Sequence, residues 1–242
     1  MRSKGFHRFE TRLIFFRQDV ELADVISRNK EYIRGDVHIF RALEQEKHPL
    51  LWERGSTHQC RKPIVKHLQK TIYVAFIKEI YEEVAEYIRY IIYHASKNGV
   101  KSDRIIGEHT FKMSANDILS LATKEDIVRA VTDQVFQQLE AERSIIALLH
   151  KVKNKLGLEV GDNIINNAVP YLTCRHIFVH ADGKPNDTFQ KDYPHIKLDA
   201  KGRIGLDVTF LSNAYNAIEA LIKVYDAEMI NKQYLPTSEI QP

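Results

Sequence analysis

The sequence predicts a mainly α-helical protein, a helical bundle with a small β-hairpin before its last helix. Three observations favour this fold class. The 242 residues include only 10 glycines and 7 prolines, so long stretches contain no residue that ends a helix. Apolar residues recur at helical spacing over most of the chain. In HIKLDAKGRIGLDV (residues 195–208), apolar and polar residues alternate around a Lys-Gly pair, which indicates a hairpin.

The N-terminal part reads as a separate, basic segment. Apolar residues at helical spacing predict an amphipathic helix over 19–47, and WERGSTHQCRKP (52–63) has the composition of a linker. Residues 1–70 carry 15 Lys and Arg against 9 Asp and Glu, which favours a polyanion such as RNA or simply a solvated helical surface. We therefore divide the chain into a helical extension with linker, 1–62, and a helical bundle, 63–242.

The bundle begins with the longest helical pattern of the chain. Pro63 in its first turn and Asn98-Gly99 just past its end are typical start and stop signals, and apolar residues nearly all round predict a central position. A connection, 99–113, follows. The remaining predicted elements are helices at 115–122, 124–156 and 163–181, the hairpin at 195–208, and a last helix from Ser212 to Ile230.

Several classes of protein are disfavoured. No apolar run approaches the roughly 18 residues of a membrane span, and the charged N-terminus does not fit a secretory signal. Two distant cysteines, Cys60 and Cys174, fit a reducing compartment, so we expect a cytoplasmic protein with no membrane partner. HExxH, paired CxxC, P-loop and GxGxxG motifs are missing, and the histidines are scattered. We therefore expect no metal and no other cofactor.

One Arg–His pair stands out by its context. Arginine followed by histidine after four to six intervening residues is too common here to be informative by itself. Only Arg175 has a second imidazole, His176, directly after it, and its pair lies on a late helix that ends in an Ala-Asp-Gly-Lys turn. The pairs are Arg2/His7, Arg41/His48, Arg61/His67, Arg89/His94, Arg104/His109, Arg143/His150 and Arg175/His180.

RHIFVHADGK (175–184) resembles the motif of the HEPN superfamily, the higher eukaryote and prokaryote nucleotide-binding domains. Its ribonuclease members carry Arg, then usually Asn, Asp or His, then three residues and His on a late helix of an all-α bundle. The resemblance extends more weakly over residues 64–230, including LLHKVKNKLGLEVGDNI and the ribbon-then-helix ending. It implies a HEPN-like bundle, similar to the stand-alone RiboL-PSP-HEPN-like proteins of defence islands.

The resemblance also implies a function. Metal-independent endoribonucleases of this kind cleave RNA by attack of the ribose 2′-hydroxyl on the adjacent phosphate, and they act as toxins or antiviral defence effectors under the control of an antitoxin or another regulatory protein. His180 would be the general acid and base, and Arg175 the phosphate-binding cation. His176 and Lys184 would position substrate or bind RNA. Imidazole and guanidinium suit these roles at neutral pH.

Helical geometry bears on how such a pair can work. Arg175 and His180 lie about 140° apart around the helix and about 7.5 Å apart along it. One helix therefore does not bring both side chains to one face, whereas two copies of 163–181 meeting about a two-fold axis can form a shared cleft. We predict a homodimer through this helix, as in HEPN ribonucleases.

Other interpretations stay open at this stage. His180 can serve only to bind the free carbonyls of a helix end, Arg175 can form a surface salt bridge, and His176 can pack in the core. Arg89 and His94 are the competing pair. A non-catalytic helical module that binds a nucleotide or a partner protein is the main alternative function, and a DNA-binding regulator that uses the basic N-terminal third is a weaker one.

Overall fold

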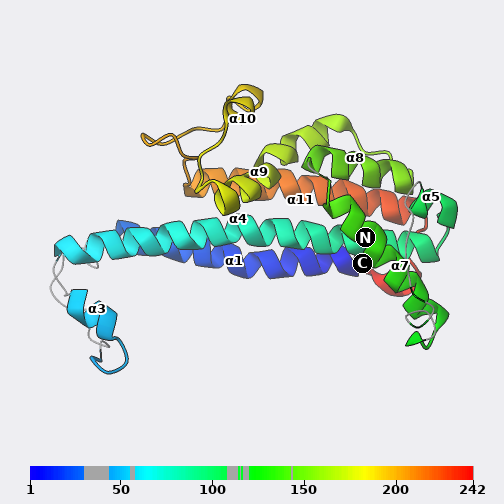
Figure 1. Ribbon diagram of the computed structural model, residues 1–242, viewed down its shortest axis with the longest axis horizontal. Coiled ribbons are helices and arrows are strands. Elements are labelled where there is room, and N and C mark those ends of the chain that lie inside the picture. The colour runs from blue at the N-terminus through cyan, green and yellow to red at the C-terminus, as the bar shows by residue number, and fades with distance from the viewer. Residues whose placement is uncertain are drawn as a thin grey trace.

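The computed structural model describes residues 1–29, 44–54, 58–107, 114, 116, 120–142 and 144–241. The chain is mainly helical, as predicted (Figure 1). In chain order its elements are β1 (Arg2–Ser3), α1 (Lys4–Arg28), α3 (Pro49–Arg54), α4 (His58–Lys97), α5 (Ser102–Ile106), α7 (Lys124–Glu140), α8 (Ile145–Leu156), α9 (Asp162–His180), α10 (Asp187–Asp192), α11 (Val208–Asn231), η2 (Thr237–Glu239) and β2 (Ile240–Gln241).

The 40-residue helix α4 is the centre of the bundle. It packs against α1, α7, α8, α9 and α11, and it runs alongside α1 for most of its length (Figure 1). A helix with neighbours on several sides needs apolar residues nearly all round, which is the pattern that predicted its central position. Its fully buried residues include Phe76, Ile77, Ile80, Val84, Ile88, Ile91 and Ile92.

The two ends of the chain meet beside α4 and α11. Strands β1 and β2 pair antiparallel, with Ser3 opposite Ile240. The buried carboxylate of Asp226 on α11 accepts hydrogen bonds from the backbone N–H and the hydroxyl of Ser3 and from the hydroxyl of Tyr87, whose oxygen is 2.9 Å away. Ser3 also accepts the N–H of Phe6 and so caps α1. A buried carboxylate with three donors is satisfied, so it fixes the start of α1 to the bundle.

The first helix was predicted too far along the chain. It spans Lys4–Arg28 instead of 19–47, and residues 30–43 lie outside the described part. The signal was present, because buried apolar residues alternate at steps of three and four, but the many charged residues between them obscured it. These residues are Phe6, Phe9, Leu13, Phe16, Val20 and Ala23, of which Phe16 is partly buried.

Three further boundaries differ from the prediction. The proposed helix 124–156 is broken into α7 and α8, although no Gly or Pro lies at the break, because each half packs separately on α4. The proposed linker 52–63 contains the end of α3 and the start of α4, which begins at His58 rather than Pro63. The last helix begins at Val208, capped by Asp207 rather than Ser212. Half of the helix proposed at 115–122 falls outside the described residues.

The small β element before the last helix forms in reduced size. One antiparallel bridge joins Leu198 to Ile204, and the N–H of Asp199 donates to the carbonyl of Arg203 across the turn at 2.7 Å. The division of the chain at residue 62 stays a prediction. Helix α1 nevertheless contributes to the same hydrophobic cluster as α4, α9 and α11.

Candidate active site

Helix α9 carries the motif, and the predicted helix 163–181 is confirmed within one residue as Asp162–His180. It packs against α11, α4 and α8. Its end is built by the predicted turn: the N–H groups of Ala181 and Gly183 both donate to the carbonyl of Ile177, and Asp182 and Gly183 take left-handed φ values of 50° and 80°. A Cβ at residue 183 would also lie 2.9 Å from the Phe178 ring, so glycine is required there.

Arg175 is held by α4. Its guanidinium lies 3.3 Å from a carboxylate oxygen of Glu82 and 5.0 Å from the centre of the Tyr81 ring. The Nε atom is buried and has no hydrogen-bond partner among the described residues. The salt bridge expected under the alternative interpretation of Arg175 is therefore present. It leaves the Nε–H of the guanidinium without a partner among the described residues.

His176 and His180 form a pair on the surface. They are four residues apart on α9, their ring centres are 4.5 Å apart, and both side chains are exposed. The alternative that His176 packs in the core is wrong: the apolar stripe of α9 turns away from it, and even Val179 is 41% exposed. Two imidazoles in contact at the exposed end of a helix can exchange protons with a bound molecule.

A cavity of about 400 Å³ opens beside Arg175 and His176. It lies where α9 meets the α7–α8 connection and α10, and aromatic and polar side chains line it, among them Tyr81, Asn186 and Tyr193. His180 does not line this cavity. The structure thus brings Arg175 and His176 to one cavity and leaves His180 outside it, in agreement with the separation of about 140° between Arg175 and His180 around the helix.

Lys184 is exposed in the turn after α9, and its N–H donates to the carbonyl of Ala181 at 2.9 Å. The neighbouring Asp182 holds two cations that sequence reasoning missed. Its carboxylate lies 2.7 Å from Arg203 and 3.9 Å from Lys70 of α4. Lysines repeat every four residues at the start of α4, and this spacing was the signal that could have indicated a basic face there.

The competing pair, Arg89 and His94, occupies a different setting. Both line one cleft of about 210 Å³ between α4, α7 and α1. Arg89 forms ion pairs with Glu86 and Asp133 and stacks on Phe136 at 4.6 Å. Burial lowers the pKa of His94, whose ring packs 4.5 Å from that of Tyr90. The arginine is already neutralised and the histidine is half-buried, which is typical of helix packing.

Cys174 next to the motif is not a nucleophile. It is buried, and its thiol contacts the carbonyl of Pro170 at 3.1 Å. Burial raises its pKa to about 12, so the reactive thiolate is not formed at neutral pH.

Comparisons with protein-family models, with curated proteins and with solved structures found no match to this chain. Within the described part of the chain, no three His, Cys, Asp or Glu side chains are grouped so that they could hold a metal ion. Among the helices in that same part, none combines the length and apolar composition of a membrane span.

Proposed function

We propose that this protein is a metal-independent endoribonuclease of HEPN type. The observation that carries the proposal is the placement of Arg175, His176 and His180 at the exposed end of one helix, with Arg175 and His176 opening onto a cavity. A guanidinium and two imidazoles are groups that suit cleavage by a 2′-hydroxyl, since the reaction needs proton transfer at two oxygens and charge stabilisation at one phosphate.

Each residue has a role in this proposal. His180 removes the proton from the 2′-hydroxyl or protonates the leaving 5′-oxygen, and the ring of His176 packs beside it. Arg175 binds the phosphate while negative charge builds up on its oxygens. Lys184, exposed directly after the turn, contacts the RNA beyond the scissile bond.

The proposal includes a homodimer through α9. Within one chain Arg175 faces the cavity while His180 lies outside it, so each copy holds half of the required constellation. The exposed face of α9 that includes Val179 offers an apolar contact to a second copy, and two-fold symmetry then brings Arg175 of each chain toward His180 of the other. As a toxin or defence effector in the cytoplasm, such a dimer would be restrained by an antitoxin or another regulatory protein.

The proposal is tested by RNA cleavage in excess EDTA. The wild-type protein is expected to cut a mixed single-stranded RNA under these conditions, because no metal takes part in the proposed reaction. The product should end in a 2′,3′-cyclic phosphate, because the 2′-hydroxyl attacks the phosphate and the 5′-oxygen leaves. His180→Ala is expected to lose about 10²- to 10⁴-fold in rate, the usual contribution of a general acid or base. His195→Ala, a substitution of an exposed histidine that lines neither the cavity beside Arg175 nor the hollow beside Lys70, is the matched control. Undiminished cleavage by His180→Ala, or cleavage that EDTA abolishes, would contradict the mechanism.

A second function is favoured by the cavity itself. Its volume of about 400 Å³ suits a mononucleotide, with Tyr81 and Tyr193 to contact a base and Arg175 to bind a phosphate. The protein would then be a non-catalytic module that binds a nucleotide or a partner protein. Nucleotide binding by calorimetry that Arg175→Ala abolishes, together with no cleavage of any RNA, would favour this function over the first.

A further inference from the structure

Helix α4 is divided by charge. Residues 58–78 contain five Lys and Arg and no Asp or Glu, whereas four glutamates lie between residues 79 and 86. In the basic half, Lys62, Lys66 and Lys70 are exposed and four residues apart, so they line one face of the helix with a rise of about 6 Å from one to the next. No carboxylate of the described residues forms an ion pair with Lys62 or Lys66.

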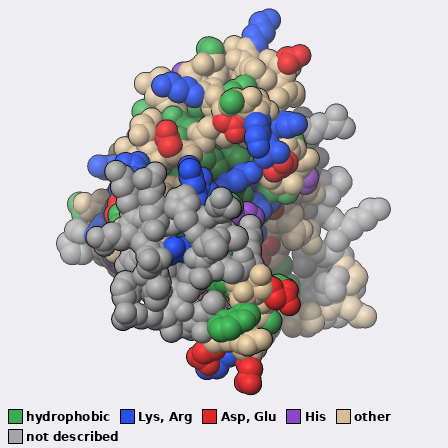
Figure 2. All heavy atoms as spheres, turned by 90° about the vertical axis from the view of Figure 1, so that its left-hand side faces the viewer, with side chains coloured by type: hydrophobic (Ala, Val, Ile, Leu, Met, Phe, Trp, Pro, Cys, Tyr) green, Lys and Arg blue, Asp and Glu red, His purple; other side chains and the backbone are tan. Residues whose placement is uncertain are grey.

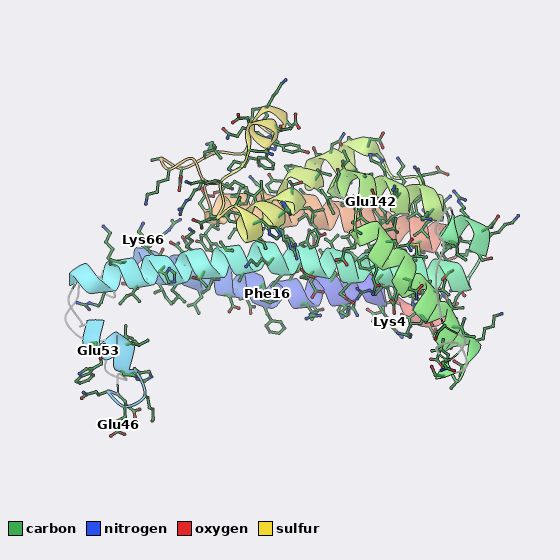
Figure 3. The ribbon with its side chains drawn as sticks, viewed as in Figure 1. Lys4, Phe16, Glu46, Glu53, Lys66 and Glu142 are labelled. Carbon is green, nitrogen blue, oxygen red and sulfur yellow. The ribbon has the colours of Figure 1, made fainter. Side chains whose placement is uncertain are left out.

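The lysine row leads to the turn that follows the motif. Lys70, at its end, meets Asp182, which lies two residues after His180. Figure 3 places Lys66 on the side of α4 that faces the segment between α9 and α11. Figure 2 shows this end of the molecule, where Lys and Arg side chains gather in a band. The basic face and the proposed catalytic histidine therefore belong to one surface.

A hollow of about 470 Å³ separates Lys70 from the turn at 199–206, and Arg203 lines its other side. The two acids of this hollow behave differently. Asp199 accepts the backbone N–H groups of Lys201 and Arg203 at 2.8 and 2.9 Å, so it shapes the turn. Asp182 instead uses its carboxylate to join Lys70 and Arg203, two cations from segments far apart in the sequence.

The Asp182 carboxylate supplies the negative charge between the two cations, Lys70 and Arg203. Its side chain is 69% exposed, so its ion pairs are solvent-screened and stabilise the fold by no more than about 1 kcal/mol. Two cations on either side of a small hollow are the arrangement that also holds a phosphate, with the arginine able to bind two of its oxygens. A phosphate group can therefore replace the carboxylate at little cost to the fold.

We propose that Lys62, Lys66, Lys70 and Arg203 bind the phosphodiester backbone of a single RNA strand and lead it to His180. In the free protein Asp182 occupies one of the phosphate positions, and the RNA displaces it. This inference rests on the proposed function, because the row matters for catalysis only if RNA is the substrate. The step of about 6 Å between lysines is comparable to the spacing of neighbouring phosphates in an extended strand.

The test measures binding of a fluorescent 20-nucleotide 2′-O-methyl RNA, which has no 2′-hydroxyl and so is not cut by the proposed reaction. Lys66→Gln and Lys70→Gln are each expected to weaken binding about three- to tenfold. Each should also make the negative slope of log K against log[salt] shallower by about 0.7. Asp182→Asn is expected to tighten binding about two- to fivefold. It preserves the size of the side chain, and Asn tolerates the positive φ at this position.

The matched controls make the same charge changes at the other end of the molecule. Lys101→Gln and Asp103→Asn, both exposed at the start of α5, are expected to bind as the wild type does (Figure 1). Lysine variants that match Lys101→Gln overturn the proposed track. An Asp182→Asn protein that binds no more tightly than Asp103→Asn overturns the role of Asp182. Binding to phosphatidylserine vesicles is measured with the same variants. If Lys66→Gln and Lys70→Gln lose binding to the vesicles while their RNA binding is unchanged, RNA is overturned as the ligand.

The outcomes separate this inference from the proposed function. If the lysines govern RNA binding but no RNA is cut in EDTA, the catalytic proposal fails and the track remains. If RNA is cut through His180 while Lys66→Gln and Lys70→Gln bind normally, the endoribonuclease remains and the track fails. A DNA strand of the same sequence is expected to depend on the same lysines, because they contact only phosphates.

Discussion

Arg89–His94 and Arg175–His180 have the same spacing on two helices that touch, yet their surroundings differ. The first pair lies inside one cleft, with its arginine bound by Glu86 and Asp133 and its imidazole half-buried between tyrosine rings. The second lies at an open helix end, with its histidine exposed and in contact with another imidazole. The two pairs therefore differ in access to solvent and not in sequence spacing.

The largest expected difference is in activity. Under the proposed mechanism, Arg175→Ala should lower the cleavage rate about 10²-fold or more, because the variant lacks the cation proposed to stabilise charge on the phosphate. Arg175→Lys should recover only part of it, since an ammonium cannot bind two oxygens in a fixed fork. Arg89→Ala should keep the rate within about twofold and instead lower the free energy of unfolding by about 1–2 kcal/mol, through loss of its ion pairs and of its contact with Phe136.

These variants are measured in one cleavage assay with excess EDTA, and their unfolding is followed by urea titration. An Arg89→Ala protein that folds normally but no longer cuts RNA would reverse the assignment of the two pairs. If Arg175→Ala lowers the cleavage rate and His180→Ala does not, Arg175 would be a binding residue only.

A smaller effect is expected from mixing variants. Arg175→Ala and His180→Ala are each expected to be nearly inactive alone, but a dimer with one copy of each holds one cleft with both groups intact if the cleft is shared between chains. Random exchange of subunits should then restore about a quarter of the wild-type rate. No recovery, in mixtures shown by mass measurement to contain the mixed dimer, would mean that each chain forms its own site.

The fold was predictable where one signal dominated. Helix α9 ends in Ala-Asp-Gly, whose left-handed residues stop the helix, and α4 is bounded by Asn98-Gly99. The break between α7 and α8 was not predictable, because no residue in it opposes a helix and the cause is packing on α4. The start of α1 was missed because charged residues lie between its buried apolar positions, and the contact that holds Ser3 to Asp226 spans 223 residues of the chain. Contacts of that range leave no local pattern.

For the site, the sequence was sufficient to place four residues at one helix end: Arg175, His176, His180 and Lys184. The predicted separation of about 140° between Arg175 and His180 around the helix agrees with the structure, in which only Arg175 lines the cavity. It could not indicate that Tyr81 and Glu82 hold Arg175, since these residues lie on another helix more than 90 positions earlier. Nor could it indicate that Lys70 and Arg203 meet at Asp182, because that depends on how the turn after α9 folds back on α4.

The smallest expected effect is on the pH dependence of stability. Burial lowers the pKa of His94 below its usual value, and Lys97 and Arg129 lower it further, while Glu239 and Glu125 oppose them. The unfolded chain therefore binds a proton at this histidine at a higher pH than the folded protein does. The contribution of His94 is fully present above about pH 6.5 and is lost as the pH falls through the window between the unfolded and the lowered folded pKa.

The melting temperature of His94→Gln should fall less than that of the wild type between pH 7.5 and 5.5, with His180→Gln at the exposed helix end as the control. If His94→Gln and the wild type lose the same amount, His94 is hydrated like a surface residue, and the contrast between the two pairs would then rest on their arginines alone.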